Sequence, residues 1–164
     1  MEEPSDKLVR HWRSLNLLIA PGNPEERVQE FESRKGVVLP HDFREYLLCV
    51  NGMVQSGGQD CDPSGFAFWP LARVKSVSDE YARHSTPMRK VQDADEHFVF
   101  VDYLQWCWAY AIRLGPRVSD GGQVIPVGTL HHKVIAGSFT EFVDLYLRDA
   151  RELYVDADTP RPTL

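Results

Sequence analysis

The stretch VQEFESRKGVVLPHDFREYLLCVNG, from Val28 to Gly52, decides the fold of this 164-residue chain. It predicts two amphipathic helices separated by Leu39-Pro40, because the residue before a proline prefers extended backbone. Gly36 is expected to end the first helix in a left-handed conformation. The second helix carries apolar residues at the i, i+3, i+4, i+7 spacing of a buried stripe, namely Phe43, Tyr46, Leu47 and Val50.

Polar residues at the ends of this stretch predict the helix boundaries. Asn23 is expected to cap the first helix, with Pro24 at its first helical position. Asn51-Gly52 is interpreted as the C-cap of the second helix, because no alternating strand precedes it as a hairpin turn would require. The region contains no nucleophile–base pair, metal-ligand cluster or phosphate-binding loop, so it predicts a fold and not a reaction.

Two more helices are predicted near the ends of the chain. The N-terminal one has an apolar face made of Leu8, Trp12, Leu15 and Ile19. The last one begins at the S-x-x-E capping box of Ser138 and Glu141. Its buried stripe consists of Phe139, Phe142, Val143, Tyr146 and Ala150.

The middle of the chain predicts strands at 66–69, 97–101 and 124–127, a short helical connection at 71–83 and a further strand at 133–136. Residues 105–114 (QWCWAYAIRL) alternate most regularly, and their apolar face consists of Trp106, Trp108, Tyr110, Ile112 and Leu114. Short turns between strands imply antiparallel pairing. The predicted fold class is therefore α+β: a single domain with a largely antiparallel sheet, on which N-terminal helices and a C-terminal helix pack.

The composition of the chain argues against certain classes of binding partner and against an oxidising compartment. The net charge of -6 and the pI of about 5.5 disfavour direct nucleic-acid binding, which usually needs a basic patch. No apolar run approaches the roughly 20 residues of a membrane span, and the acidic start lacks the apolar core of a signal peptide. Three cysteines without paired spacing argue against a disulfide framework, so we expect buried free thiols at Cys49 and Cys107 in a reducing cytoplasm.

The order of these motifs resembles the SUKH superfamily, which includes fungal cell-wall assembly regulators and many bacterial immunity proteins. The matching residues are Phe31-Glu32, Gly36, Leu39-Pro40, Asp42-Phe43, Tyr46-Leu47 and Asn51-Gly52. A second stretch, 136–142 (AGSFTEF), is similar to the helix that closes the family domain. On this resemblance, residues 8–153 form the domain, between a flexible N-terminus at 1–7 and a flexible tail at 154–164.

The resemblance implies a non-enzymatic protein-binding domain without a cofactor. In bacterial members the usual role is to neutralise a toxin, often a nuclease or a deaminase, by direct binding. In fungal members the role is regulatory scaffolding on an endogenous protein, and this remains the alternative. A gene for a large secreted toxin beside this one would support immunity, and the oligomeric state stays open.

Three patterns that could carry chemistry are incomplete. Residues 60–65 (DCDPSG) copy the front half of a calcium-binding loop, but Leu71 stands where a bidentate glutamate is needed. His131-His132 have no Cys, Asp or Glu at ligand spacing beside them. Trp69, Trp106 and Trp108 could stack on nucleic-acid bases only within a basic groove, and a covered sheet face explains them better. We therefore expect no metal, no cofactor and no catalytic residue.

The resemblance offers no residue pattern for the binding face, so contact residues are chosen by charge and expected exposure. Acidic groups on surface loops can steer a basic protein toward binding. Two loops carry such groups, and the predicted partner-binding residues are Asp60, Asp62, Asp93, Asp95 and Glu96.

Overall fold

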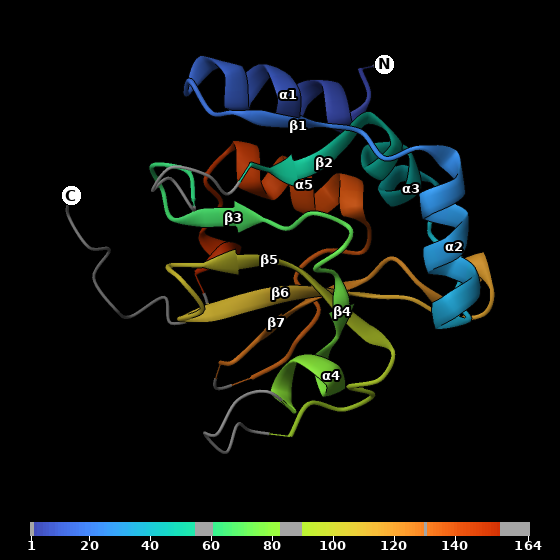
Figure 1. Ribbon diagram of the computed structural model, residues 1–164. Helices are drawn as coiled ribbons and strands as arrows, with labels where there is room; N and C mark the ends of the chain where they lie inside the picture. Colours follow the sequence, from blue (N-terminus) through green and yellow to red (C-terminus); the bar gives the residue numbers. More distant parts are fainter. Residues whose placement is uncertain (1, 55–60, 83–89, 130, 155–164) are drawn as a thin grey trace.

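The computed structural model describes residues 2–54, 61–82, 90–129 and 131–154 (Figure 1). In these ranges the α-helices are α1 (Pro4–Ser14), α2 (Glu25–Lys35), α3 (His41–Cys49), α4 (Val77–Tyr81) and α5 (Phe139–Leu147). The strands are β1 (Ile19–Pro21), β2 (Val50–Met53), β3 (Phe66–Phe68), β4 (Lys75–Ser76), β5 (His97–Tyr103), β6 (Trp108–Arg113) and β7 (Val124–Val127). Short 3-10 turns occupy Val118–Asp120 and Arg151–Leu153. None of the described helices is long and apolar enough to cross a bilayer.

The sheet is antiparallel, as the short turns predict. Its strands follow the order β3-β5-β6-β7, and β4 pairs with β5 beside β3. The register places Val101 opposite Tyr110 and Ala111 opposite Ile125. A separate antiparallel pair joins β1 to β2. The predicted α+β class is confirmed, with antiparallel sheets and helices in one chain.

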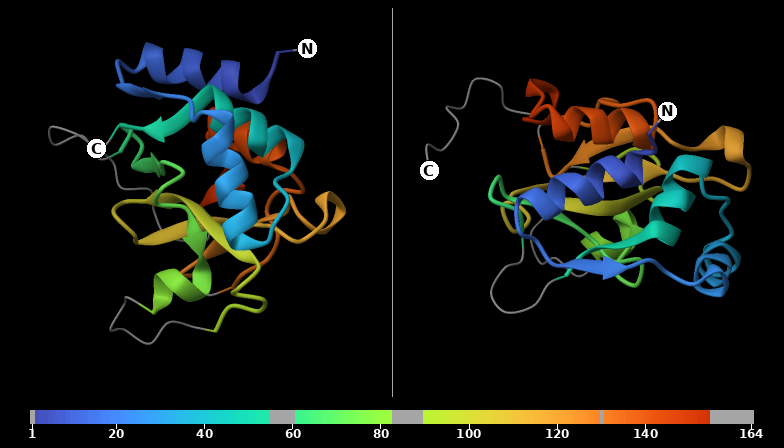
Figure 2. Two further views of the ribbon diagram at one scale, coloured as in Figure 1. Left: turned by 45° about the vertical axis from the view of Figure 1, so that its right-hand side comes forward. Right: turned by 90° about the horizontal axis from the view of Figure 1, so that it is seen from above.

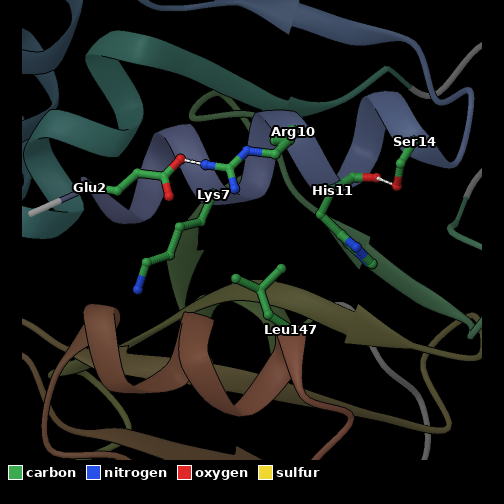
Figure 3. A pocket seen from close by; sticks show the side chains of 6 residues that line it. All are labelled: Glu2, Lys7, Arg10, His11, Ser14 and Leu147. Carbon is green, nitrogen blue, oxygen red and sulfur yellow. Dashed lines mark hydrogen bonds and ion pairs between the residues drawn. The ribbon is translucent and has the colours of Figure 1, made fainter.

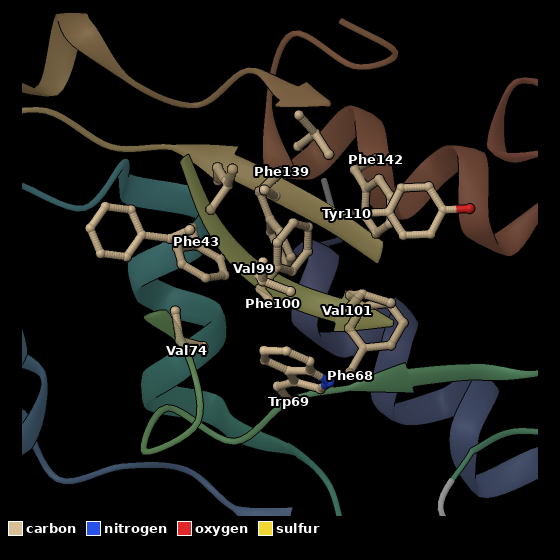
Figure 4. Close-up of a cluster of buried hydrophobic side chains, with 14 of the residues drawn as sticks. Phe43, Phe68, Trp69, Val74, Val99, Phe100, Val101, Tyr110, Phe139 and Phe142 are labelled. Carbon is tan, nitrogen blue, oxygen red and sulfur yellow. The ribbon is translucent and has the colours of Figure 1, made fainter. Parts of the chain in front are cut away.

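The main core lies between the sheet and helices α1, α3 and α5. Its centre is a group of aromatic rings on one sheet face (Figure 4). The ring centroids of Phe43 and Phe139 are 5.2 Å apart, and those of Phe100 and Phe142 are 5.1 Å apart. Helix α4 lies on the opposite face of the sheet from α5 (Figure 2). Both faces are therefore covered, and Ala109 and Ala111 are fully buried on the α4 side.

The region that decides the fold forms as predicted, except at its caps. Gly36 ends α2 with φ 65°, and Leu39-Pro40 leads into α3. Pro24, and not Asn23, is the N-cap of α2. Asn23 instead donates from Nδ2 to the Leu47 carbonyl at 2.8 Å and to Asn51 Oδ1 at 3.0 Å.

Asn51-Gly52 is not the C-cap of α3, because the chain passes directly into β2. Val50 follows the helix in extended conformation. Gly52 has φ 69°, and a Cβ there would lie 2.6 Å from the Phe68 carbonyl oxygen. Asn51 Oδ1 also accepts from the Leu71 backbone N–H at 2.8 Å. The Asn-Gly pair thus joins β2 to the β3 region rather than stopping a helix.

The N-terminal helix is shorter at its end than the predicted apolar face. Helix α1 begins at Pro4, with Pro4 and Ser5 buried, and ends at Ser14. Leu8 and Trp12 of the predicted face are buried on it, whereas Leu15 is its C-cap and Ile19 belongs to β1, so the prediction was wrong for these two residues. Of the predicted flexible tail, residues 155–164 lie outside the described residues.

The strand predicted at 105–114 is shorter than its alternation suggested. Strand β6 begins at Trp108, and the residues before it form the turn from β5. Leu104, Gln105 and Trp106 have φ values of 47°, 53° and 71°. The side chain of Trp106 therefore belongs to the turn, while Tyr110 and Ile112 keep their predicted face. The strand predicted at 133–136 is reduced to one bridge between Val124 and Ala136, and the helical connection at 71–83 to β4 and α4.

A polar clasp holds the start of α5 against the start of α3. The Ser138 hydroxyl accepts from the Glu141 N–H at 3.1 Å, which confirms the predicted cap. Asp42 Oδ2 accepts from both the backbone N–H and the hydroxyl of Thr140, each at 2.8 Å. Its other oxygen accepts from the Phe43 N–H. The two motifs that carry the family resemblance thus touch in space.

The cysteines differ from their predicted burial. Cys49 and Cys107 are exposed, and Cys61 is half-buried. Cys49 is the last residue of α3, and Cys107 lies in the β5–β6 turn rather than inside a strand. Cys49 and Cys107 are free thiols, as predicted, but they are not buried.

Candidate protein-binding surface

Of the five predicted contact residues, the three in the loop before β5 are exposed. Asp93, Asp95 and Glu96 all lie at the surface. Asp93 adopts φ 53°, and its carbonyl accepts from the Glu96 N–H at 2.9 Å, which closes the turn. Glu96 forms an ion pair with Arg113 of β6 at 2.7 Å. Three of the five predicted contact residues therefore lie in one acidic loop at the start of β5.

A pocket of about 350 Å³ adjoins this acidic loop. It lies between the loop, the ends of β5 and β6, and the segment after β7. We call it the acidic pocket, and its lining consists of Gln92, Asp93, His97, Arg113, Gln123, Ile125, His132 and Val134. The antiparallel register places His97 opposite Arg113 and so brings two of the lining residues side by side. Val134 is 57% exposed, so the rim also presents an apolar side chain.

Of the lining residues, only Asp93 was a predicted contact, and Gln123 is the most informative of those that the sequence did not predict. Its backbone carbonyl accepts from the Arg113 N–H at 2.8 Å, which fixes the residue at the end of β6. Its side-chain Oε1 is buried and has no hydrogen-bond partner among the described residues. A buried acceptor without a partner costs about 1–3 kcal/mol. A glutamine after a Gly-Gly turn carries no motif that could have pointed to this position.

His97 lines the acidic pocket, is buried, and is neutral near pH 7. Burial lowers the pKa of its ring, and the Asp93 carbonyl, 2.9 Å from Nδ1, opposes that shift only in part. Because a carbonyl oxygen can only accept a hydrogen bond, Nδ1 is the protonated ring nitrogen and donates a hydrogen bond to it. Nearby Arg113 lowers the pKa of His97 further. The histidine contributes hydrogen bonding to the pocket and no positive charge.

The other predicted acidic loop does not supply a steering charge at Asp62. Asp62 is 4% exposed, so the prediction of an exposed carboxylate there was wrong. Its Oδ1 accepts from the N–H groups of Ser64 and Phe66 at 2.9 Å, and its Oδ2 accepts from the Tyr146 hydroxyl at 2.5 Å. The Asp-Pro-Ser-Gly sequence is itself typical of an Asx-turn, and that signal could have been weighed. Asp60 lies outside the described residues.

The remaining sequence candidates form no metal site in the described part of the chain. No group of three or more His, Cys, Asp or Glu side chains is arranged there to hold an ion. His132 lines the acidic pocket, whereas His131 is exposed. Both oxygens of Asp62 are engaged within the protein, so residues 62–65 form a structural turn.

A buried polar cluster occupies the α4 side of the sheet. Trp69 donates from Nε1 to Asp102 Oδ2 at 2.6 Å, and the Arg73 guanidinium lies 3.9 Å from the Trp69 ring centroid. Burial raises the pKa of Asp102, while the Trp69 bond and the charge of Arg73 oppose the rise. Trp69 is almost fully buried and cannot stack on a base. This cluster orders the sheet rather than presenting a binding surface.

A second hollow lies on the helical side, between α1 and α5 (Figure 3). Its volume is about 450 Å³, and it is lined by Glu2, Lys7, Arg10, His11, Ser14 and Leu147. Lys7 pairs with Asp144 of α5 at 3.0 Å, and Arg10 pairs with Glu2. Because both cations already have carboxylate partners, this hollow offers less uncompensated charge than the acidic loop.

The comparison with known families agrees with the geometry. A family model described as the SMI1 / KNR4 family (SUKH-1) matches residues 22–145. No curated protein matches the chain well enough to serve as a relative. The matched range contains α2, α3, the whole antiparallel sheet and most of α5, including the clasp between Asp42 and Thr140. Because this match spans well over half of its length, the chain belongs to the SMI1 / KNR4 family (SUKH-1).

Proposed function

We propose that this protein is an immunity protein that neutralises a toxin domain by binding it directly. The observation that carries the proposal is membership of the SMI1 / KNR4 family across residues 22–145. At the family level, membership supports a protein-binding domain of the immunity or regulatory kind, and the family is generally non-catalytic. Neutralisation would take place in the cytoplasm of the cell that makes the protein.

Electrostatics supports a basic toxin domain, such as a nuclease or a nucleic-acid deaminase. The chain carries a net charge of -6, and the acidic loop before β5 exposes Asp93 and Asp95. Neither carboxylate has an ion-pair partner among the described residues, whereas Glu96 is paired with Arg113. Uncompensated charges at a binding surface raise association rates, up to about 10⁹ M⁻¹s⁻¹ at low salt. Fast association suits a protein that must bind a toxin before it acts.

Affinity capture tests this proposal. Tagged full-length protein is used to capture partners from its native cells at low and at high salt, and the partners are identified by mass spectrometry. The proposal expects a secreted toxin whose purified toxic domain loses its activity when an equimolar amount of this protein is added. A housekeeping complex as the specific partner, or a captured toxin that stays fully active in the complex, would overturn it. The first of these results would favour the regulatory-scaffold alternative.

A further inference from the structure

The lining of the acidic pocket includes two hydrogen-bond acceptors that differ in burial. One is Gln123 Oε1, which is buried and has no partner among the described residues. The other is the Asp93 carboxylate, which is exposed. Such a ligand must carry several donors, because one donor alone cannot satisfy both acceptors. A guanidinium group has five N–H donors in a planar fork and fits this requirement better than a single ammonium point charge.

The charges around the pocket also favour a cation. Its one fully ionised cation, Arg113, is paired with Glu96 through Nε at 3.0 Å and Nη2 at 2.7 Å. Burial keeps His97 neutral. Exposed Lys90 and Lys133 lie beside the lining residues in sequence, as Asp95 does. Among the described lining residues, Asp93 is the charge left unpaired once Arg113 is bound to Glu96, and it would repel a carboxylate and attract a basic side chain.

The apolar lining suits the aliphatic stem of a long basic residue. Ile125 is buried within the pocket wall, while Val134 stands 57% exposed at its rim. The methylene groups of an arginine can pack on such side chains while its charged end bonds elsewhere. A volume of about 350 Å³ accommodates one side chain rather than a whole helix. Arginine is also among the residues that most often anchor protein interfaces.

We propose that the acidic pocket receives one arginine side chain of the toxin partner, with its guanidinium between Gln123 Oε1 and Asp93 and its stem against Ile125 and Val134. This inference rests on the proposed immunity function for the identity of the partner. The chemistry of the pocket can be tested independently of that function.

The test uses ¹⁵N-labelled full-length protein and two small probes, N-acetyl-arginine methylamide and its neutral near-isostere N-acetyl-citrulline methylamide. The arginine probe is expected to give saturable shifts at the Gln123 side-chain amide and the Val134 backbone amide, and the citrulline probe is not. The double variant Gln123→Met with Asp93→Asn should weaken arginine binding about 10-fold or more. Asp6→Asn, exposed on α1, is the matched charge control and should leave binding unchanged.

Each alternative result is informative. Equal shifts with citrulline, no saturable shift at Gln123, or a double variant that binds like the wild type would overturn the arginine assignment. A toxin captured with undiminished affinity by a double variant that has lost the probe would overturn the pocket as its anchor but leave the immunity function standing. If the protein binds the arginine probe but captures no toxin, the proposed pocket chemistry is supported and the proposed immunity function is contradicted.

Discussion

At the residue scale, a buried hydrogen-bond chain ties three distant parts of the sequence together. Trp12 of α1 donates from Nε1 to the Tyr146 hydroxyl at 3.2 Å, and that hydroxyl donates to Asp62 Oδ2 at 2.5 Å. Asp62 in turn holds the turn that enters β3. Burial raises the pKa of Tyr146 strongly, and the neighbouring Asp62 charge raises it further, so the phenol stays protonated as a donor.

Tyr146→Phe should therefore destabilise the protein by about 1–3 kcal/mol, because it leaves a buried carboxylate oxygen without its donor. Urea unfolding followed by tryptophan fluorescence measures this loss. Tyr154→Phe is the matched control, since its hydroxyl bonds to the exposed Asp149 and should cost less than about 0.5 kcal/mol. Equal losses in the two variants would show that the buried chain adds nothing specific.

His97 should make stability depend on pH in a defined direction. Because burial lowers its pKa in the folded state, the unfolded chain binds a proton more readily below about pH 6.5. The free energy of unfolding should thus fall as the pH drops from about 7.5 through this range. His97→Asn, which keeps a donor but does not titrate, should flatten the fall in denaturant titrations at several pH values. The exposed His131→Asn should leave the slope as in the wild type, and a flat wild-type profile would contradict the prediction.

At the element scale, the β5–β6 turn is the most strained part of the described backbone. Leu104, Gln105 and Trp106 all have positive φ, and none is glycine. The left-handed conformation costs roughly 1–2 kcal/mol for a residue with a side chain. Alternation within 105–114 could not reveal this turn, because the same letters would also fit a longer strand. The turn is needed because the chain must reverse direction after β5 so that β6 can pair with it antiparallel.

Substitutions at Gln105 test this strain, because its side chain is exposed and contributes little packing. Gln105→Gly should raise the free energy of unfolding by about 0.5–1 kcal/mol, the relief being offset in part by the entropy of glycine. Gln105→Val should lower it by about 1–2 kcal/mol, since a branched side chain fits this conformation worst. Thermal and urea unfolding would rank the three proteins, and a glycine variant less stable than the valine variant would refute the strain.

The clasp between α3 and α5 is a second feature of this scale. Asp42→Ala removes the acceptor of both hydrogen bonds between the helix starts, whereas Thr140→Ala removes only the hydroxyl donor and leaves the backbone N–H. Each single variant should lose about 1–2 kcal/mol, and the double variant should lose clearly less than the sum, with a coupling of about 0.5–3 kcal/mol. A double-mutant cycle in urea measures that coupling. Strict additivity would mean that the Asp42–Thr140 contact does not connect the helices energetically.

Local signals in the sequence predicted the helices well because their causes are local. Gly36, the Leu39-Pro40 break and the Ser138 cap act on neighbouring residues, and the structure confirms all three. Asn23 and Asn51 failed as predicted caps because they bond to each other across the fold. A residue whose partner is distant in sequence gives no local pattern, so its role could not be predicted.

At the scale of the whole molecule, the two faces of the sheet differ in what they contact. One face packs its aromatic rings against α1, α3 and α5. The other carries α4, the Trp69–Asp102–Arg73 cluster and, at its β7 side, the acidic pocket. The sequence predicted the acidic loop at 93–96, because charge and exposure can be read from composition. It did not predict the pocket, because His97, Arg113, Gln123 and Val134 meet only through antiparallel pairing and the return of the chain past β7.

We propose that the acidic loop guides a basic toxin domain to this protein. The most direct test of this proposal is the association rate with the captured toxin domain, measured by stopped flow at several salt concentrations. The protein would be compared with Asp93→Lys/Asp95→Lys and with Glu26→Lys/Glu30→Lys, a matched reversal of exposed charges on α2. We predict that reversal in the acidic loop slows association about 10-fold or more at low salt and flattens its salt dependence, while the reversal on α2 has a much smaller effect. Equal rates and equal salt dependence in all three proteins would contradict the account.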